Sequence, residues 1–100
     1  MKVYIISDIV VHDQQKYEEY MKLVPDTIKK YEGKYLVRGG EIITQSGDCI
    51  PKGRCVVLEF SSIDALNKWN TSSEYQPVKK IRESCSTSQS FIVSSGDLPF

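Results

Sequence analysis

Three side chains of this chain could take part in acid–base or charge-stabilising chemistry. His12 is the only histidine, and an imidazole is the side chain that most readily exchanges a proton near neutral pH. Arg38 and Glu59 are charged residues in otherwise apolar segments, where an unpaired charge must find a partner or reach solvent. These are the candidate catalytic residues. Arg38 would anchor or polarise an anionic or carbonyl group, and His12 or Glu59 would move a proton.

Each of these residues also has a purely structural interpretation. A single histidine in a loop is more often solvated than catalytic. Arg38 and Glu59 could form an ion pair that fixes the register of two strands or closes the edge of a dimer. A bulge at Gly39 and Gly40 would turn both charges to one face, close to His12, whereas without the bulge they point to opposite faces. The sequence leaves both arrangements open.

Aromatic residues supply a second set of candidates, because phenol groups can orient a ligand in a cavity between helices and sheet. The aromatic residues considered are Tyr4, Tyr17, Tyr20, Trp69 and Tyr75. Tyr20 and Tyr75, together with Arg38, are the candidate ligand-binding residues. We favour a packing role for Tyr17 and Trp69.

The first half of the chain predicts a strand, a helix and a second strand that hold these groups. The run Lys2–Val11 is apolar and β-branched, as in a central strand. Asp13 is a suitable N-cap for a helix whose apolar residues recur at steps of three and four. Gly33 is expected to end this helix in a left-handed conformation. The segment Lys34–Ser46 predicts a strand that is kinked by its paired glycines.

The second half predicts a hairpin partner, a broken helix and a last strand. Glycines at both ends of Gly47–Gly53 indicate a loop before the strand Arg54–Phe60. A serine-led helix follows, is interrupted at Asn70–Ser73 and resumes at Tyr75. Ser90–Ser94 predicts a short final strand. Cys55 is expected in the core and Cys49 in an exposed loop.

The resulting βαββαβ order predicts an α+β, ferredoxin-like fold, in which a four-stranded antiparallel sheet carries its helices on one face. We expect a single domain over residues 1–95 and a C-terminal tail over residues 96–100. Two strands are apolar at odd and even positions alike, so the helix-free sheet face would expose an apolar patch. This pattern predicts a homodimer through that face.

Composition argues against several classes of protein. The 13 basic and 13 acidic residues cancel, so nothing attracts a nucleic acid, and the third strand lacks the stacking aromatics of an RNA-recognition motif. No apolar run is long enough for a membrane helix. Three cysteines without a Cys-x-x-Cys pair and one histidine predict neither a disulfide framework nor a metal site. We expect a cytoplasmic protein without a cofactor.

Several strings along nearly the whole chain resemble the family known as domain of unknown function 1330. The matching strings are Asp13 with Tyr17-x-x-Tyr20, Tyr35-Leu36-Val37-Arg38-Gly39-Gly40, Val57-Leu58-Glu59-Phe60, and Ser73-Glu74-Tyr75 leading to Arg82. The resemblance implies a dimeric α+β barrel, from a superfamily that includes cofactor-free monooxygenases and isomerases and also proteins with no demonstrated chemistry. The chain departs from the family pattern in its single Gly33, its Cys49-containing loop and its tail.

Two functional hypotheses follow. The first is a cofactor-independent enzyme that acts on a small carbonyl, carboxylate or aromatic metabolite. The second is a non-catalytic small-ligand-binding or structural dimer. They differ in whether Arg38, Glu59 and a tyrosine hydroxyl meet at an open cavity.

Overall fold

The computed structural model describes residues 1–96 and confirms the ferredoxin-like fold. Its elements are β1 (Val3–Val11), α1 (Gln14–Lys30), β2 (Lys34–Arg38), β3 (Arg54–Phe60), α2 (Ile63–Thr71), α3 (Tyr75–Cys85) and β4 (Ser86–Ser94). The strands form one antiparallel sheet in the order β2-β3-β1-β4. Apart from Gly96, the tail predicted at residues 96–100 lies outside the described residues. Within the described part, no helix is long and apolar enough to cross a membrane.

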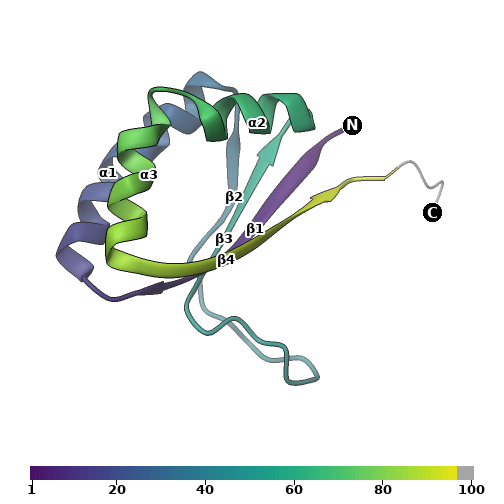
Figure 1. The fold of residues 1–100 in the computed structure, drawn as a ribbon. Helices are drawn as coiled ribbons and strands as arrows, with labels where there is room; N and C mark the ends of the chain where they lie inside the picture. Colours follow the sequence, from purple (N-terminus) through teal and green to yellow (C-terminus); the bar gives the residue numbers. More distant parts are fainter. Residues whose placement is uncertain (97–100) are drawn as a thin grey trace.

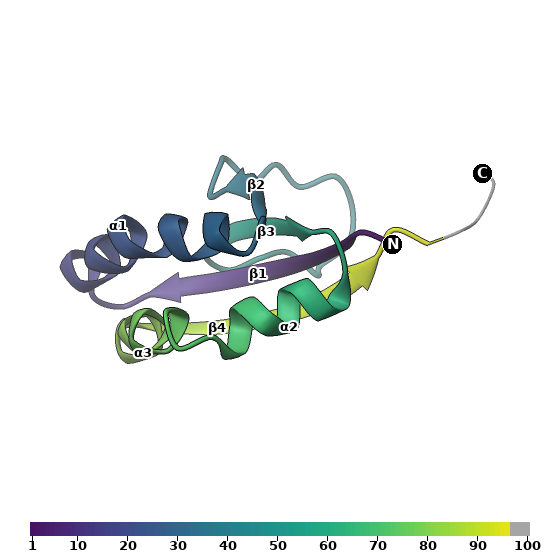
Figure 2. The same ribbon diagram turned by 90° about the horizontal axis from the view of Figure 1, so that it is seen from above.

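All three helices cover one face of the sheet (Figure 1). Seen from above, α1 lies over the β1–β3 side, and α2 and α3 follow the β4 side (Figure 2). Alternate residues of each strand point to this layer, so the core includes Ile9 of β1 and Leu58 and Phe60 of β3. Phe60 packs against Trp69 of α2, with ring centroids 5.4 Å apart. The core therefore lies entirely between the helices and one face of the sheet.

The second strand is much shorter than the predicted Lys34–Ser46. It ends at Arg38, and its register shift lies between Tyr35 and Val37 instead of at the glycine pair. Gly39 has a φ of +75°, which turns the chain out of the strand path. The prediction was wrong because the β-branched residues beyond Gly40 pair with no strand in the described part of the chain. Residues 39–53 instead form a long connection that projects beyond the sheet (Figure 1) and is called the arm below.

The end of α1 also differs from the prediction. The left-handed residue is Glu32, with a φ of 61°, and Gly33 has no positive φ. Gly33 is instead required for space, since a Cβ there would lie 2.7 Å from Phe60 and 2.8 Å from Ile28. The glycine therefore permits the chain to pass close to the core.

The predicted break in the second helical region is confirmed. The Oγ of Ser72 donates to the carbonyl of Trp69 at 2.7 Å and accepts from the backbone N–H of Tyr75 at 3.2 Å, so one serine links α2 to α3. The last strand begins at Ser86, four residues before the predicted start. Its polar residues give little strand signal, but their backbone pairs with β1 as far as Val11. Pairing with a neighbour therefore overrides the weak local preference.

Candidate functional site

Two adjoining cavities lie between the helices and the sheet, and a more open hollow of about 350 Å³ between α1, β1 and the start of β3 shares Arg54 with one of them. The main cavity has a volume of about 170 Å³ and extends from β1, β3 and β4 to the three helices. A smaller recess of about 40 Å³ lies beside it, between α1, β2 and β3. The two share four wall residues, Ile9, Tyr20, Val56 and Leu58. The sheet thus forms a common apolar floor, and the polar groups come mainly from the helices and from β2 and β3.

All three arginines of the chain line this space. Arg82 of α3 lines the main cavity, and Arg38 of β2 and Arg54 of β3 line the recess. Neither lining contains an Asp, a Glu or a His. Within residues 1–96 the two ion pairs are Lys2–Glu59 and Lys30–Glu74, so none of the arginines is paired with a carboxylate there. The cavities therefore carry positive charge that the described residues leave uncompensated.

Arg82 is held on the inner face of α3 and keeps an unused hydrogen-bond donor. Its Nη1 donates to the Oγ of Ser88 on β4 at 2.6 Å. Its Nε is buried and has no hydrogen-bond partner among the described residues. A buried donor without an acceptor costs on the order of 1–3 kcal/mol. A bound water or a ligand oxygen could satisfy such a donor.

Arg54 has the same property at the recess. Its Nη2 donates to the backbone carbonyl of Arg38 at 2.9 Å, but its buried Nε has no partner among the described residues. Gly39 makes room for this guanidinium, since a Cβ there would lie 2.5 Å from Nη1. The Arg38 guanidinium stacks on the ring of Tyr35, 4.0 Å from its centroid. The recess thus has two guanidinium groups at its wall.

The phenol groups of the site act as hydrogen-bond donors. Tyr20 and Tyr75 lie with their hydroxyl oxygens 3.3 Å apart, and the Tyr75 ring stacks on Trp69 with centroids 4.1 Å apart. Burial raises the pKa of Tyr20 far above its ordinary value, with a further contribution from the Tyr75 hydroxyl. Burial also raises the pKa of Tyr17 and of Tyr35. Tyr17, Tyr20 and Tyr35 therefore stay protonated at neutral pH.

The structure brings some predicted residues together and separates others. Arg38, Tyr20 and Tyr75 all line the cavities. Glu59 does not, because it alternates with Leu58 and Phe60 and so points to the helix-free face, where it pairs with Lys2 at 3.6 Å. Arg38 pairs across the sheet with Val56 and points toward the helices. Arg38 and Glu59 are therefore on opposite faces and are not partners.

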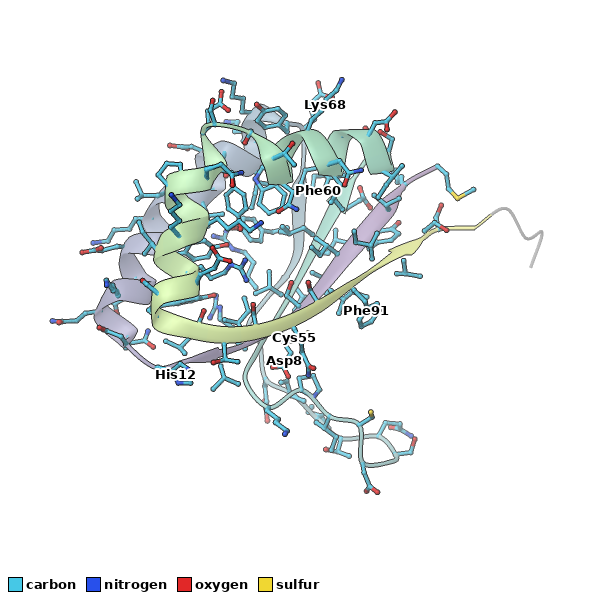
Figure 3. The ribbon with its side chains drawn as sticks, viewed as in Figure 1. Asp8, His12, Cys55, Phe60, Lys68 and Phe91 are labelled. Carbon is cyan, nitrogen blue, oxygen red and sulfur yellow. The ribbon has the colours of Figure 1, made fainter. Side chains whose placement is uncertain are left out.

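His12 also lies away from the cavities. It follows β1 at the end of the sheet (Figure 3), and its Nε2 is 2.7 Å from the Oγ1 of Thr87. Of the aromatic candidates, Tyr17 and Trp69 are buried in the core. Tyr4 is instead on the helix-free face, since it pairs with Glu59 and Val93. Cys55, expected in the core, lies on that same face, and Cys49 is exposed as expected.

Sequence reasoning missed Arg54 and Arg82 as site residues. A signal for Arg82 was present, because it follows Val78 by four residues and precedes Cys85 by three, and both neighbours are buried on the inner face of α3. Arg54 alternates with Val56 and Leu58 toward the helices. In both cases, the helical or strand periodicity placed an arginine on a buried face.

The helix-free face is different in character. Val37 is 39% exposed, Val93 45% and Phe91 61%. A hollow of about 440 Å³ lies between this face and the arm. Asp8 holds the arm there, accepting from the backbone N–H groups of Lys52 at 2.9 Å and Gly53 at 2.8 Å. Among the described residues, no group of three or more His, Cys, Asp or Glu could hold a metal ion.

Solved structures with the same fold include proteins with and without a described activity. A protein of unknown function from Rhodopseudomonas palustris has a TM-score of 0.78 at 12% identity, over 97% of this chain and 84% of its own. SnoaB, a cofactor-independent oxygenase from Streptomyces nogalater, has a TM-score of 0.66 at 14% identity, over 98% and 96% of the two chains. At such identities these similarities show the fold alone.

The sequence comparisons identify the family. A search of curated proteins finds no significant match. The model of the family described as "Domain of unknown function (DUF1330)" matches residues 2–95. The match covers both cavity walls, the arm and all three arginines. The chain therefore belongs to the DUF1330 family.

Proposed function

We propose that this protein binds a small anionic molecule, a carboxylate or an enolate, in the main cavity with Arg82 as its anchor. The observation that carries the proposal is the buried Nε of Arg82, which has no acceptor among the described residues and belongs to a side chain that lines the main cavity. A ligand oxygen would satisfy this donor and would compensate the guanidinium charge. Lys79 also lines the cavity and adds a second positive charge.

The cavity favours a small and partly aromatic ligand. Its volume of about 170 Å³ lies below the roughly 300–1,000 Å³ of sites for drug-sized molecules. Trp69, Tyr75 and Tyr20 provide aromatic surface on which a planar ligand can pack. The Tyr20 and Tyr75 hydroxyls lie close enough to act on the same polar group. This combination suits a compact, planar metabolite with a negatively charged end.

Binding is a better description of this site than proton-transfer catalysis. The linings contain cations, phenols, hydroxyls and one amide, and no side chain that would accept a proton at neutral pH. The proposal therefore gives no role to His12 or Glu59. A cofactor-independent enzyme is the second candidate, and it is favoured by the donors grouped at Arg82, Tyr20 and Tyr75, which could stabilise a developing oxyanion.

A thermal-shift screen with substituted benzoates and short aliphatic carboxylates tests the binding proposal. A ligand at one hundred times its Kd should stabilise the protein by about 2.7 kcal/mol. Arg82→Gln should abolish this stabilisation. The matched control is Lys80→Gln, which removes a positive charge from the exposed side of α3, outside both cavity linings. Equal stabilisation of wild type and Arg82→Gln would remove Arg82 from the site, and no stabilisation by any compound would contradict the proposal.

We further propose that the protein forms a homodimer through its helix-free face. The exposed apolar side chains of Val37, Phe91 and Val93 support this arrangement, because a two-fold axis would cover each patch with its counterpart. Light scattering after size-exclusion chromatography should give twice the chain mass at micromolar concentration. A folded monomer under those conditions would contradict the proposal. The three unpaired thiols agree with the expected cytoplasmic compartment.

A further inference from the structure

The recess next to the main cavity has its own unsatisfied cation. Arg54 lines the recess, and its buried Nε lacks an acceptor among the described residues, as Arg82 does at the main cavity. The Arg38 guanidinium borders the same recess. Resting on the proposed function, we infer that the ligand carries two acidic groups, one held by Arg82 and the other by Arg54 with Arg38. The substrate class is a short dicarboxylate.

The two cation sites belong to adjoining cavities. The cavities share the side chains of Ile9, Tyr20, Val56 and Leu58 as common walls. Tyr17 lies between them: its ring centroid is 6.0 Å from the Arg54 guanidinium carbon and 5.4 Å from the ring centroid of Tyr20, which lines both cavities.

The size and charge of the recess favour a carboxylate over the alternatives. A volume of about 40 Å³ holds about three waters, which is too little for a ring but enough for one acidic group. Water could accept from the Arg54 Nε, but it would leave two neighbouring guanidinium charges uncompensated in a partly buried site. A carboxylate supplies both the acceptor and the charge, and the planar guanidinium matches its geometry.

Matched pairs of ligands test this inference by calorimetry at fixed ionic strength. The probes are succinate, glutarate and adipate, each compared with its monomethyl ester, which keeps the length and removes one charge. Wild type should bind the best diacid at least about tenfold more tightly than its ester, which corresponds to about 1.4 kcal/mol. Arg54→Gln should reduce the diacid to the affinity of the ester and leave ester binding unchanged. Arg82→Gln should weaken both.

The control variant is Lys52→Gln, which removes a nearby positive charge that lines neither cavity, so the diacid preference should remain. If Arg54→Gln does not fold, Arg54→Lys keeps the charge but loses the Nε donor, and it should lower the diacid preference. Equal binding of diacid and ester by wild type would overturn the dicarboxylate inference while leaving the proposed function intact. Binding of neither by wild type would also overturn the dicarboxylate inference, and the benzoate arm of the thermal-shift screen would then decide the proposed function separately.

Discussion

The two faces of this sheet are built from the same strands but differ in almost every property. The face toward the helices is closed over an apolar floor and holds all three arginines without a carboxylate in the cavity linings. The face away from the helices holds Glu59 and Asp8, exposes apolar side chains and carries the arm. Neighbouring residues of one strand therefore belong to different environments, and strand alternation separates the proposed ligand chemistry from the proposed assembly surface.

Two phenylalanines give the sharpest test of this contrast. Phe60 is fully buried on the helix side, whereas Phe91 is 61% exposed on the other (Figure 3). Phe60→Ala should lower the free energy of unfolding by about 3–5 kcal/mol, because it leaves a cavity in the core. Phe91→Ala should change the stability of the folded chain little but weaken the dimer. Chemical denaturation and light scattering of both variants measure the two effects, and equal losses of stability would break the distinction.

A smaller loss of stability is expected from a substitution at Gly33, which lies on the helix side of the sheet. Gly33→Ala introduces a Cβ 2.7 Å from the Phe60 ring and 2.8 Å from Ile28. The resulting overpacking should lower the free energy of unfolding by about 1–3 kcal/mol. Gly40→Ala is the matched control, since a Cβ there meets nothing within 4 Å. Urea denaturation that gives similar midpoints for the two variants would contradict the close approach.

A pH effect is also expected on the helix side. Glu74 accepts from Lys30 and from the Tyr31 hydroxyl, which lowers its pKa from 4.5 to about 2. A carboxylate whose pKa is lower in the folded state stabilises above its unfolded pKa and loses that contribution as pH falls through the folded value. Stability should therefore decline as pH falls from about 4.5 toward 2. Glu74→Gln should flatten this part of the profile in thermal melts, and an unchanged profile would exclude the contact.

The smallest effect on global stability is expected on the helix-free side, at Asp8. Its carboxylate accepts from the backbone N–H groups of Lys52 and Gly53, and these hydrogen bonds lower the pKa of Asp8. Asp8→Asn should loosen the arm and speed proteolysis within residues 39–53, while the melting temperature stays nearly unchanged. Mass spectrometry of the cleavage products locates the cuts. Unchanged cleavage in the arm would indicate that its conformation does not depend on Asp8.

The sequence was sufficient for the element order but not for the site. Hydrophobic periodicity predicted the βαββαβ arrangement, because an element that is buried on one face has apolar residues at regular intervals in its sequence. Whether Arg38 and Glu59 lie on the same face of the sheet depended on the position of one bulge, because a register shift of one residue moves a side chain to the opposite face. Ile42 and Ile43 favour a strand locally, but β-structure needs a partner, and the arm pairs with no strand of residues 1–96. The cavity depends on packing that no local pattern encodes.

The Nε–H resonances of arginine offer the most direct test of the central claim. The chain has three arginines, so a ¹⁵N-edited spectrum contains a small set of Nε–H signals that Arg82→Gln and Arg54→Gln assign by loss. Titration with glutarate should move the Arg82 and Arg54 signals along one saturable curve, because both buried donors gain a carboxylate acceptor. Signals that stay in place while glutarate binds would contradict a ligand site on the helix side of the sheet.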